Sequence, residues 1–313
     1  MKDKLNDNAL MLVEAMLADD DLLRISDRVA SNGAHRVDCG IDSRGGLVAG
    51  RWLAEVCLGG LAEVCLESAD FTGTRVVIQT DHPVLACLGG QYAGWKIVDG
   101  DYFAMGSGPF RVLARKEELV EELNLGTSGP VAVGVLETAQ LPPDSVCKSI
   151  AAACGVATED LWLLAAPTAS QAGNIQVVAR SVETALHQLH ELKFPVERVV
   201  SGWGAAPLPP IAKNDMEGIG RTNDAILYGA DVTLWFDGDD DEIQRVGPSI
   251  PSNSSPDYGE PFGEIFKRYD YDFYKIDPSL FSPARIRFNN IKTGKTWLYG
   301  ELAPQIAAKS FGM

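Results

Sequence analysis

The stretch from Leu161 to Leu192 constrains the fold most, because one hydrophobic pattern gives way to another within it. Residues 161–166 form an apolar run that ends at Pro167, which is typical of a buried strand. Residues 168–174 supply turn formers, and from Ile175 onward apolar residues recur at three- and four-residue spacing. That spacing predicts a long helix with one buried face, so the stretch should form a strand, a loop and an amphipathic helix.

The opposite face of this predicted helix carries Arg180, Glu183, His187 and His190 at successive steps of three or four residues. The face could be solvated, with an Arg–Glu pair worth only about 0.2–0.5 kcal/mol. Its carboxylate and imidazoles could bind a metal, although no HExxH motif or further Cys or His cluster stands nearby. Glu183 could instead take a proton from water while Arg180 orients it. The spacing alone does not choose among these interpretations.

The composition is that of a globular protein with two ordinary domains. Of 313 residues, 46% are hydrophobic and 22% are charged. The net charge of −16 argues against nucleic acid as a partner, since phosphate backbones require Lys and Arg. No apolar run is long enough to span a bilayer and no signal-peptide pattern is visible, so we expect a cytoplasmic protein without a membrane partner. The six cysteines lack a CxxC spacing and are expected to be buried free thiols.

Two segments have an ambiguous local pattern. LAEVCL occurs at 53–58 and again at 61–66, with two glycines between the copies. An eight-residue shift keeps the phase of a strand but not that of a helix, so we predict a helix for the first copy and a strand for the second. The segment GWGAAPLPP at 202–210 is rich in Gly and Pro and is predicted to cross between lobes.

Two further segments are candidate ligand contacts. Gly106, Ser107 and Gly108 precede a predicted helix start at Pro109, where free backbone N–H groups could bind an anion, although a plain tight turn fits equally well. The segment 218–224, GIGRTND, could contact a polar ring through its side chains, or could be a turn followed by a helix cap.

Several long sequence blocks together resemble one enzyme family. The blocks are TDHP, AGW, GDYFAMGSGP, APTAS, RSVET, GIGRTND, YDFYKIDP, FSPAR and SFGM, in this order along nearly the whole chain. The chain is similar in these blocks to methenyltetrahydromethanopterin cyclohydrolases. The resemblance implies reversible hydrolysis of a methenyl-pterin to its formyl derivative in one-carbon metabolism, in methane formation or formaldehyde oxidation.

The resemblance also implies an architecture. We expect an α+β fold of two lobes, each with mixed or mainly antiparallel sheets, and an active-site cleft between them. The first lobe should cover residues 1–129 and the second residues 130–313; the alternative is discontinuous domains in which the C-terminal strands return to the first lobe. A homo-oligomer, a trimer or a dimer, is implied, and neither a metal nor another cofactor is expected.

The resemblance assigns roles to particular residues. It implies that Glu183 activates or guides the attacking water and that Arg180 lies beside it. Gly106, Ser107 and Gly108 are expected to contact the substrate. The pterin ring is expected to contact three residues of the GIGRTND block: Thr222, Asn223 and Asp224. The archaeal pattern of the family carries Lys in the segment before AGW, whereas this chain carries Tyr92 there. The resemblance therefore does not supply a cationic substrate contact at this position, and Tyr92 is the candidate contact.

Two rival functions remain open. A nicotinamide-dependent methylene-pterin dehydrogenase should carry a GxGxxG fingerprint after a strand, and the sequence has none. A non-catalytic pterin-binding protein would keep the cleft and lose the chemical pair, whereas both Arg180 and Glu183 are present.

Overall fold

The structure is a computed structural model that describes residues 1–313 and divides them into two compact units. Unit 1 contains Met1–Ala62 and Leu85–Gln176, and unit 2 contains Glu63–Val84 and Val177–Met313. Each unit is therefore built from two separate segments of the chain. This division differs from the one expected after residue 129, which lies inside unit 1, and the C-terminal strands stay in unit 2.

Unit 1 contains a six-stranded mixed sheet with a parallel centre. Its strand order is β1-β2-β8-β7-β6-β5, in which β8 runs parallel to both β2 and β7 and the outer pairs are antiparallel. The observed β8 coincides with the predicted strand 161–166. The strands are β1 (Ser26–Asp27), β2 (His35–Asp38), β5 (Trp95–Asp99), β6 (Tyr102–Ser107), β7 (Ala132–Glu137) and β8 (Leu161–Ala166).

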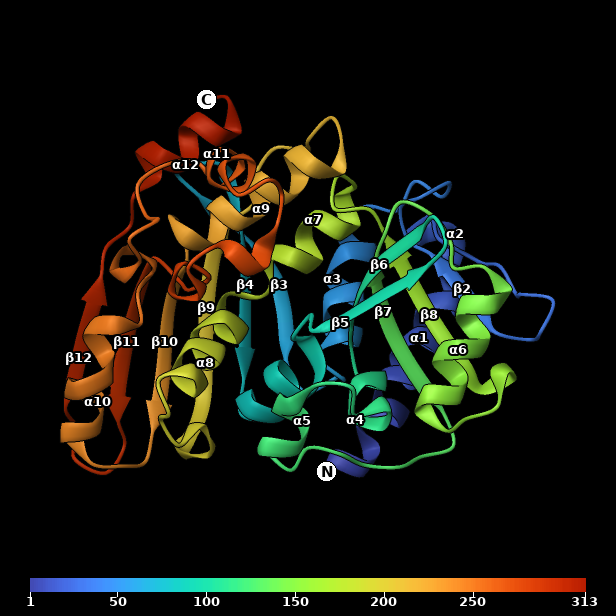
Figure 1. Cartoon of the computed structure of the whole chain (residues 1–313), viewed down its shortest axis with the longest axis horizontal. Coiled ribbons are helices and arrows are strands. Elements are labelled where there is room, and N and C mark those ends of the chain that lie inside the picture. The colour runs from blue at the N-terminus through green and yellow to red at the C-terminus, as the bar shows by residue number, and fades with distance from the viewer. The chain divides into compact units, whose positions relative to one another are not determined.

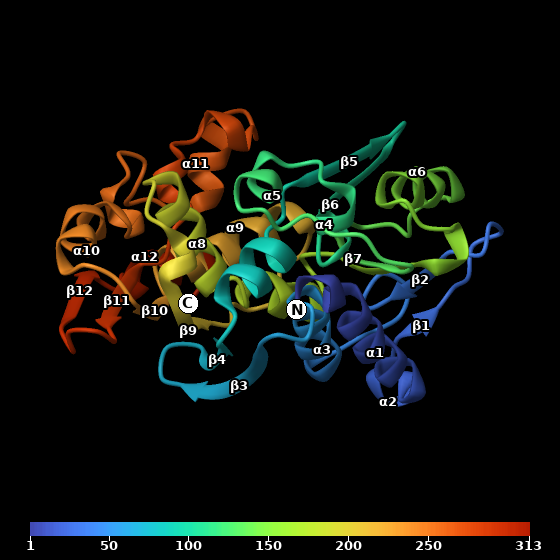
Figure 2. The same cartoon turned by 90° about the horizontal axis from the view of Figure 1, so that it is seen from below.

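Helices cover both faces of this sheet, as Figure 2 shows for α1 and α3 on one side and α6 on the other. In β7, Val133 and Val135 join a core with α1 and α3, whereas Ala132 and Leu136 join a second core with α4 and α6. A strand buried on both faces reads as a continuous apolar run. The helices are α1 (Leu5–Ala18), α2 (Asp20–Leu23), α3 (Leu47–Cys57), α4 (Phe110–Ala114), α5 (Glu118–Glu122), α6 (Asp144–Cys154), α7 (Gln171–Val178) and the π-helix η2 (Val84–Gln91).

Unit 2 contains a second six-stranded sheet, which is mainly antiparallel. Its strand order is β12-β11-β10-β9-β4-β3, and only β10 and β11 pair in parallel. Figure 1 shows β12, β11, β10 and β9 side by side. The hairpin β3–β4 comes from early in the chain and joins this sheet by pairing β4 with β9. The strands are β3 (Glu63–Ala69), β4 (Gly73–Thr80), β9 (Val199–Pro207), β10 (Asp231–Phe236), β11 (Arg285–Asn290) and β12 (Thr296–Gly300).

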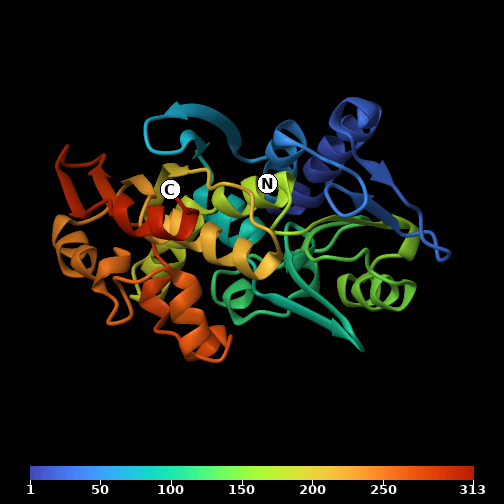
Figure 3. The ribbon, with the colours of Figure 1, turned by 90° about the horizontal axis from the view of Figure 1, so that it is seen from above.

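One face of the second sheet is covered by helices. In β11, Ile286 and Phe288 are buried while Arg285 and Arg287 are partly exposed, which is the alternation of a sheet with one solvated face. Figure 2 shows α8 and α10 on the same side of the sheet, and Figure 3 shows α9 beside α12. The helices are α8 (Ser181–Glu191), α9 (Asp215–Leu227), α10 (Asp240–Val246), α11 (Phe262–Arg268) and α12 (Pro304–Phe311).

Two open mixed sheets, each with packed helices, confirm the predicted α+β class. The predicted C-terminal hairpin is present as β11 and β12, and α6 ends at Gly155 in the left-handed conformation as predicted. No helix of the chain is both long and apolar enough to cross a membrane.

The two copies of LAEVCL adopt the predicted different structures. The first copy lies in α3 as far as Cys57, and β3 begins at Glu63 within the second. Gly59 and Gly60 separate them with φ values of 64° and 67°, which end the helix at little steric cost. Cross-strand pairing with β4 then decides the second copy, because identical local propensity cannot.

Two sequence expectations about local structure are wrong. The single long helix expected from Ile175 is two helices, since α7 begins earlier, at Gln171, and a break at residues 179–180 separates it from α8. The expected crossover at 202–210 is instead largely β9, a strand in the middle of the second sheet. Its glycines read as a loop from sequence but face a closely packed helix in the structure.

Candidate functional site

Arg180 and Glu183 lie at the start of α8. Arg180 is the residue before the first helical turn, and Glu183 belongs to that turn. Arg180 Nε lies 3.6 Å from Glu183 Oε2, and their side chains are only 14% and 6% exposed. A fully solvated face is therefore excluded at this end of α8. The ion pair is longer than a hydrogen bond, so it leaves acceptor capacity on the carboxylate.

The apolar stripe of α8 holds this pair against the sheet. Val182, Leu186 and Leu189 have no exposed surface, and α8 packs on β9 and β10. Burial of each of these side chains contributes about 1.5–3 kcal/mol relative to exposure. The predicted periodicity is confirmed for these positions, and it fixes the side of the helix on which Glu183 lies.

No cluster of metal ligands forms around the histidines of this helix. His187 Nε2 lies 3.8 Å from Glu191 Oε1, an ion pair that forms only when the imidazole is protonated. No group of three or more His, Cys, Asp or Glu side chains in residues 1–313 is arranged to hold a metal ion.

Gly106 and Ser107 end β6 in unit 1, and Gly108 follows the strand. The Gly108 N–H donates to the Gly90 carbonyl at 2.7 Å, and Ser107 Oγ lies 3.2 Å from Cys57 Sγ. The Gly108 N–H is thus already bonded within the unit, and the helix that follows has only one short turn and a half. Substrate contact by these three residues stays a prediction.

Tyr92 belongs to an arrangement in unit 1 that the sequence did not reveal. The guanidinium of Arg111 lies 5.1 Å from the centre of the Tyr92 ring, and Arg111 is only 1% exposed. Arg111 Nε donates to Glu117 at 2.9 Å, its Nη2 also contacts Glu117, and Nη1 donates to three carbonyls at the end of η2. Arg111 therefore holds the π-helical segment that leads into Tyr92. Its only sequence signal was an arginine within the apolar segment FRVLA.

Thr222, Asn223 and Asp224 lie inside α9, so the alternative of a turn and a helix cap at these positions is wrong. The N-cap is Asn214, whose side chain accepts the Glu217 N–H. Thr222 Oγ1 donates to the Gly218 carbonyl and Asn223 Nδ2 to the Ile219 carbonyl, four residues back in each case. These bonds stay within the helix, so pterin contact by the three residues remains a prediction.

Asp224 is a buried carboxyl group that accepts the Phe262 N–H at 2.8 Å. Burial raises the pKa of Asp224 to about 7, against the lowering effect of the Ser310 hydroxyl and the Phe262 N–H. This residue is therefore a titratable group near neutral pH that connects α9 to the start of α11.

The cysteines are mainly structural, as expected. Five of the six are buried, and Cys65 is exposed. Burial raises the pKa of the Cys147 thiol to about 11 and that of the Cys154 thiol to about 12. Neither thiol is a nucleophile at neutral pH, because the thiolate is the reactive form.

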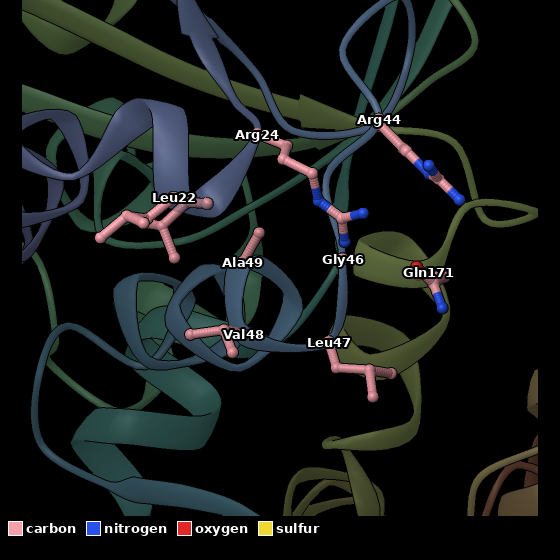
Figure 4. A pocket seen from close by; sticks show the side chains of 9 residues that line it. Leu22, Arg24, Arg44, Gly46, Leu47, Val48, Ala49 and Gln171 are labelled. Carbon is pink, nitrogen blue, oxygen red and sulfur yellow. The ribbon is translucent and has the colours of Figure 1, made fainter.

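A surface pocket of about 360 Å³ lies in unit 1, between α2 and the start of α3. Figure 4 shows the guanidinium of Arg24 beside Gly46, at the point where α3 begins, with Arg44 and Gln171 also lining the pocket. None of the residues predicted from sequence lines it.

The pair in α8 is the arrangement best suited to chemistry. A carboxylate beside a guanidinium and largely withdrawn from solvent can accept a proton from water, which is the group that a hydrolase needs. Its two residues belong to the RSVET block, one of those that carry the family resemblance.

Comparison with known proteins agrees with that class. The sequence profile of the family described as "Cyclohydrolase (MCH)" matches residues 4–311. The chain is 53% identical to the methenyltetrahydromethanopterin cyclohydrolase of Rhodopirellula baltica, over 90% of this chain and 87% of that protein. It is 48% identical to the protein of the same name from Xanthobacter autotrophicus, over 96% and 90% of the two chains. For that of Methanococcoides burtonii, the identity is 39% over 98% of each chain.

The chain therefore belongs to this cyclohydrolase family, and the resemblance read from the sequence blocks is confirmed.

Proposed function

We propose that this protein reversibly hydrolyses N5,N10-methenyltetrahydromethanopterin to N5-formyltetrahydromethanopterin, as a hydrolase acting on a cyclic amidine in one-carbon metabolism. The observation that carries the proposal is family membership over nearly the whole chain, together with retention of both Arg180 and Glu183.

The substrate already supplies the electrophile. Its methenyl carbon bridges two nitrogens as an amidinium-like cation, so water can add to that carbon once a proton is removed. Cleavage of the bond from this carbon to N10 then leaves the formyl group on N5, with net release of one proton. This route requires neither a metal nor a redox cofactor, and we propose that the enzyme uses none.

Glu183 is the group we assign to water activation. Its carboxylate is withdrawn from solvent, and the ion pair with Arg180 leaves oxygen lone pairs for a water molecule. General base assistance of this kind is typically worth about 10²- to 10⁴-fold in rate. Arg180 would orient this carboxylate through the ion pair.

The remaining assignments concern binding and assembly. Gly106, Ser107, Gly108 and Tyr92 are proposed substrate contacts in unit 1. Thr222, Asn223 and Asp224 are proposed pterin contacts in unit 2. A cytoplasmic homo-oligomer, a trimer or a dimer, fits the family resemblance.

The direct test follows the near-ultraviolet absorbance of methenyltetrahydromethanopterin with purified protein, with buffer-catalysed hydrolysis subtracted. Rapid loss of the methenyl band, insensitive to a chelator and poor with the methenyl folate analogue, is the expected result. Measurable binding without acceleration above buffer would favour a non-catalytic pterin-binding protein and reject the catalytic assignments. Turnover that requires a nicotinamide would favour the dehydrogenase alternative.

A further inference from the structure

Two glycines of β9 lie directly under the first turn of α8. A Cβ atom built on Gly204 would be 2.4 Å from Ser181 Oγ and 3.0 Å from Val182 Cγ2. A Cβ on Gly202 would be 2.8 Å from Val182 Cγ1. Real Cβ atoms essentially never approach a heavy atom more closely than 3.0 Å, so a larger residue at 204 forces either the Ser181 side chain or the start of α8 to shift.

The need for glycine at these positions is spatial and not conformational. Neither Gly202 nor Gly204 has a positive φ, and both pair regularly with β4 and β10. Glycine in the interior of a strand weakens it and often marks close approach of another segment. Here that segment is the helix start that bears the Arg–Glu pair.

The contact residues on α8 lie between the two members of the pair. Ser181 and Val182 follow Arg180 and precede Glu183, and they are 1% and 0% exposed. The depth at which these two side chains sit on β9 therefore determines where the Glu183 carboxylate lies relative to the rest of unit 2. A displacement of about 1 Å at a reacting group can lower a rate by about 10²-fold.

We propose that Gly202 and Gly204 are positioning residues for the Arg180–Glu183 pair: without side chains, they let the first turn of α8 lie on the backbone of β9. This inference rests on the proposed function, because it links the position of α8 on β9 to the rate of turnover. It also explains why a central strand of the sheet contains the glycines of the segment GWG.

The test is a double-mutant cycle on Gly204 and Ser181, with kcat, KM and thermal midpoint measured for each variant. Gly204→Ala should lower kcat about 10- to 100-fold with little change in KM, since an ordinary contact of 3.4 Å with Ser181 Oγ is about 1 Å longer than the 2.4 Å that the new Cβ would have. Ser181→Ala alone should stay near wild type. The double variant should recover most of the lost kcat, because the shortest contact is removed and the next are 3.0 Å and 3.3 Å.

A matched control separates positioning from general overpacking. A Cβ on Gly229 would be 2.5 Å from Pro207 Cγ, at the far end of the same strand. Gly229→Ala should lower the thermal midpoint and leave kcat unchanged. Equal kcat losses in Gly204→Ala and Gly229→Ala, or no recovery in the double variant, would overturn the proposal.

A second pair keeps the test decisive if Gly204→Ala does not fold. Gly202→Ala meets Val182 Cγ1, so Gly202→Ala should lower kcat and Val182→Ala should restore part of it. Full kcat in folded Gly202→Ala, or a loss that Val182→Ala does not restore, would overturn the proposal. Failure of the proposed function has a different signature, namely a wild-type protein without turnover or a Glu183→Gln variant with normal kcat.

Discussion

Two largely buried Arg–Glu pairs, one in each unit, differ in the contact that their own two side chains make with each other. In unit 1, Arg111 makes two contacts to Glu117 and three to backbone carbonyls of η2. In unit 2, Arg180 and Glu183 meet at 3.6 Å, beyond hydrogen-bond length. The first pair stabilises the fold of unit 1. In the second pair, the Glu183 carboxylate can still accept a proton or a hydrogen bond from water.

The chemical difference follows from geometry rather than residue type. The Arg111 fork donates along two parallel directions to one carboxylate, which is the strong arrangement for a buried ion pair. Removal of one partner from such a pair leaves an uncompensated buried charge. The Arg180–Glu183 pair is three residues apart at a helix start, a geometry that orients the carboxylate without saturating it.

The largest expected effect comes from Glu183→Gln, which tests whether the Arg180–Glu183 pair acts in catalysis. Loss of the basic carboxylate should lower kcat by about 10²- to 10⁴-fold while substrate binding is kept, as the methenyl absorbance assay and a binding titration would measure. Glu191→Gln on the same helix, whose side chain is 50% exposed, is the matched control and should retain turnover. Near-normal kcat in Glu183→Gln would reject Glu183 as the essential group.

Arg111→Gln tests whether the Arg111–Glu117 pair stabilises the fold. It should lower the free energy of unfolding by about 3–5 kcal/mol, because the Glu117 charge and three carbonyls lose their partner inside the protein. Chemical denaturation measures this directly. A decrease of less than about 1 kcal/mol in the free energy of unfolding is typical of an exposed ion pair. Such a result would show that Arg111 does not stabilise this part of the fold.

Asp224 extends the comparison to a buried carboxyl group without an arginine. Its pKa of about 7 in the folded protein exceeds its ordinary value of 3.8, so the folded state binds the proton more tightly. Stability contributed by this group is complete below about pH 4 and is lost as the pH rises towards 7. At one pKa unit per about 1.4 kcal/mol, the loss is at most about 4 kcal/mol.

Asp224→Asn removes this titration and can still accept the Phe262 N–H. Its free energy of unfolding, relative to wild type, should therefore increase between pH 4 and pH 8, by a few kcal/mol at most. Denaturation curves at several pH values provide the measurement. A difference that is constant with pH would mean that Asp224 does not titrate in this range.

Arg180→Lys should have the smallest effect. The ammonium keeps the positive charge and loses the planar, fixed donor geometry, so kcat should fall roughly tenfold, or about 1.4 kcal/mol of transition-state energy. The free energy of unfolding should change far less than in Arg111→Gln. Comparable destabilisation in both variants would erase the distinction between the two pairs.

Local patterns predicted a substantial part of the fold. The strand β8, the C-terminal hairpin and the Gly155 end of α6 follow from apolar runs and turn residues that act over a few positions. Local sequence patterns failed where tertiary packing determines the structure. The GWG segment reads as a loop, and only contact with Ser181 and Val182 shows why a central strand contains these glycines.

By itself, the sequence determined the family, through that resemblance the α+β class, and the closeness of Arg180 and Glu183, because these depend on contiguous blocks and their spacing. Tertiary structure alone decided that β3 and β4 belong with β9 in unit 2, that GIGRTND lies inside a helix and that Arg111 braces η2. The physical reason is that these outcomes depend on contacts and pairings between segments distant in the chain. Packing space and hydrogen-bond partners there are set by the whole unit, and no local pattern encodes them.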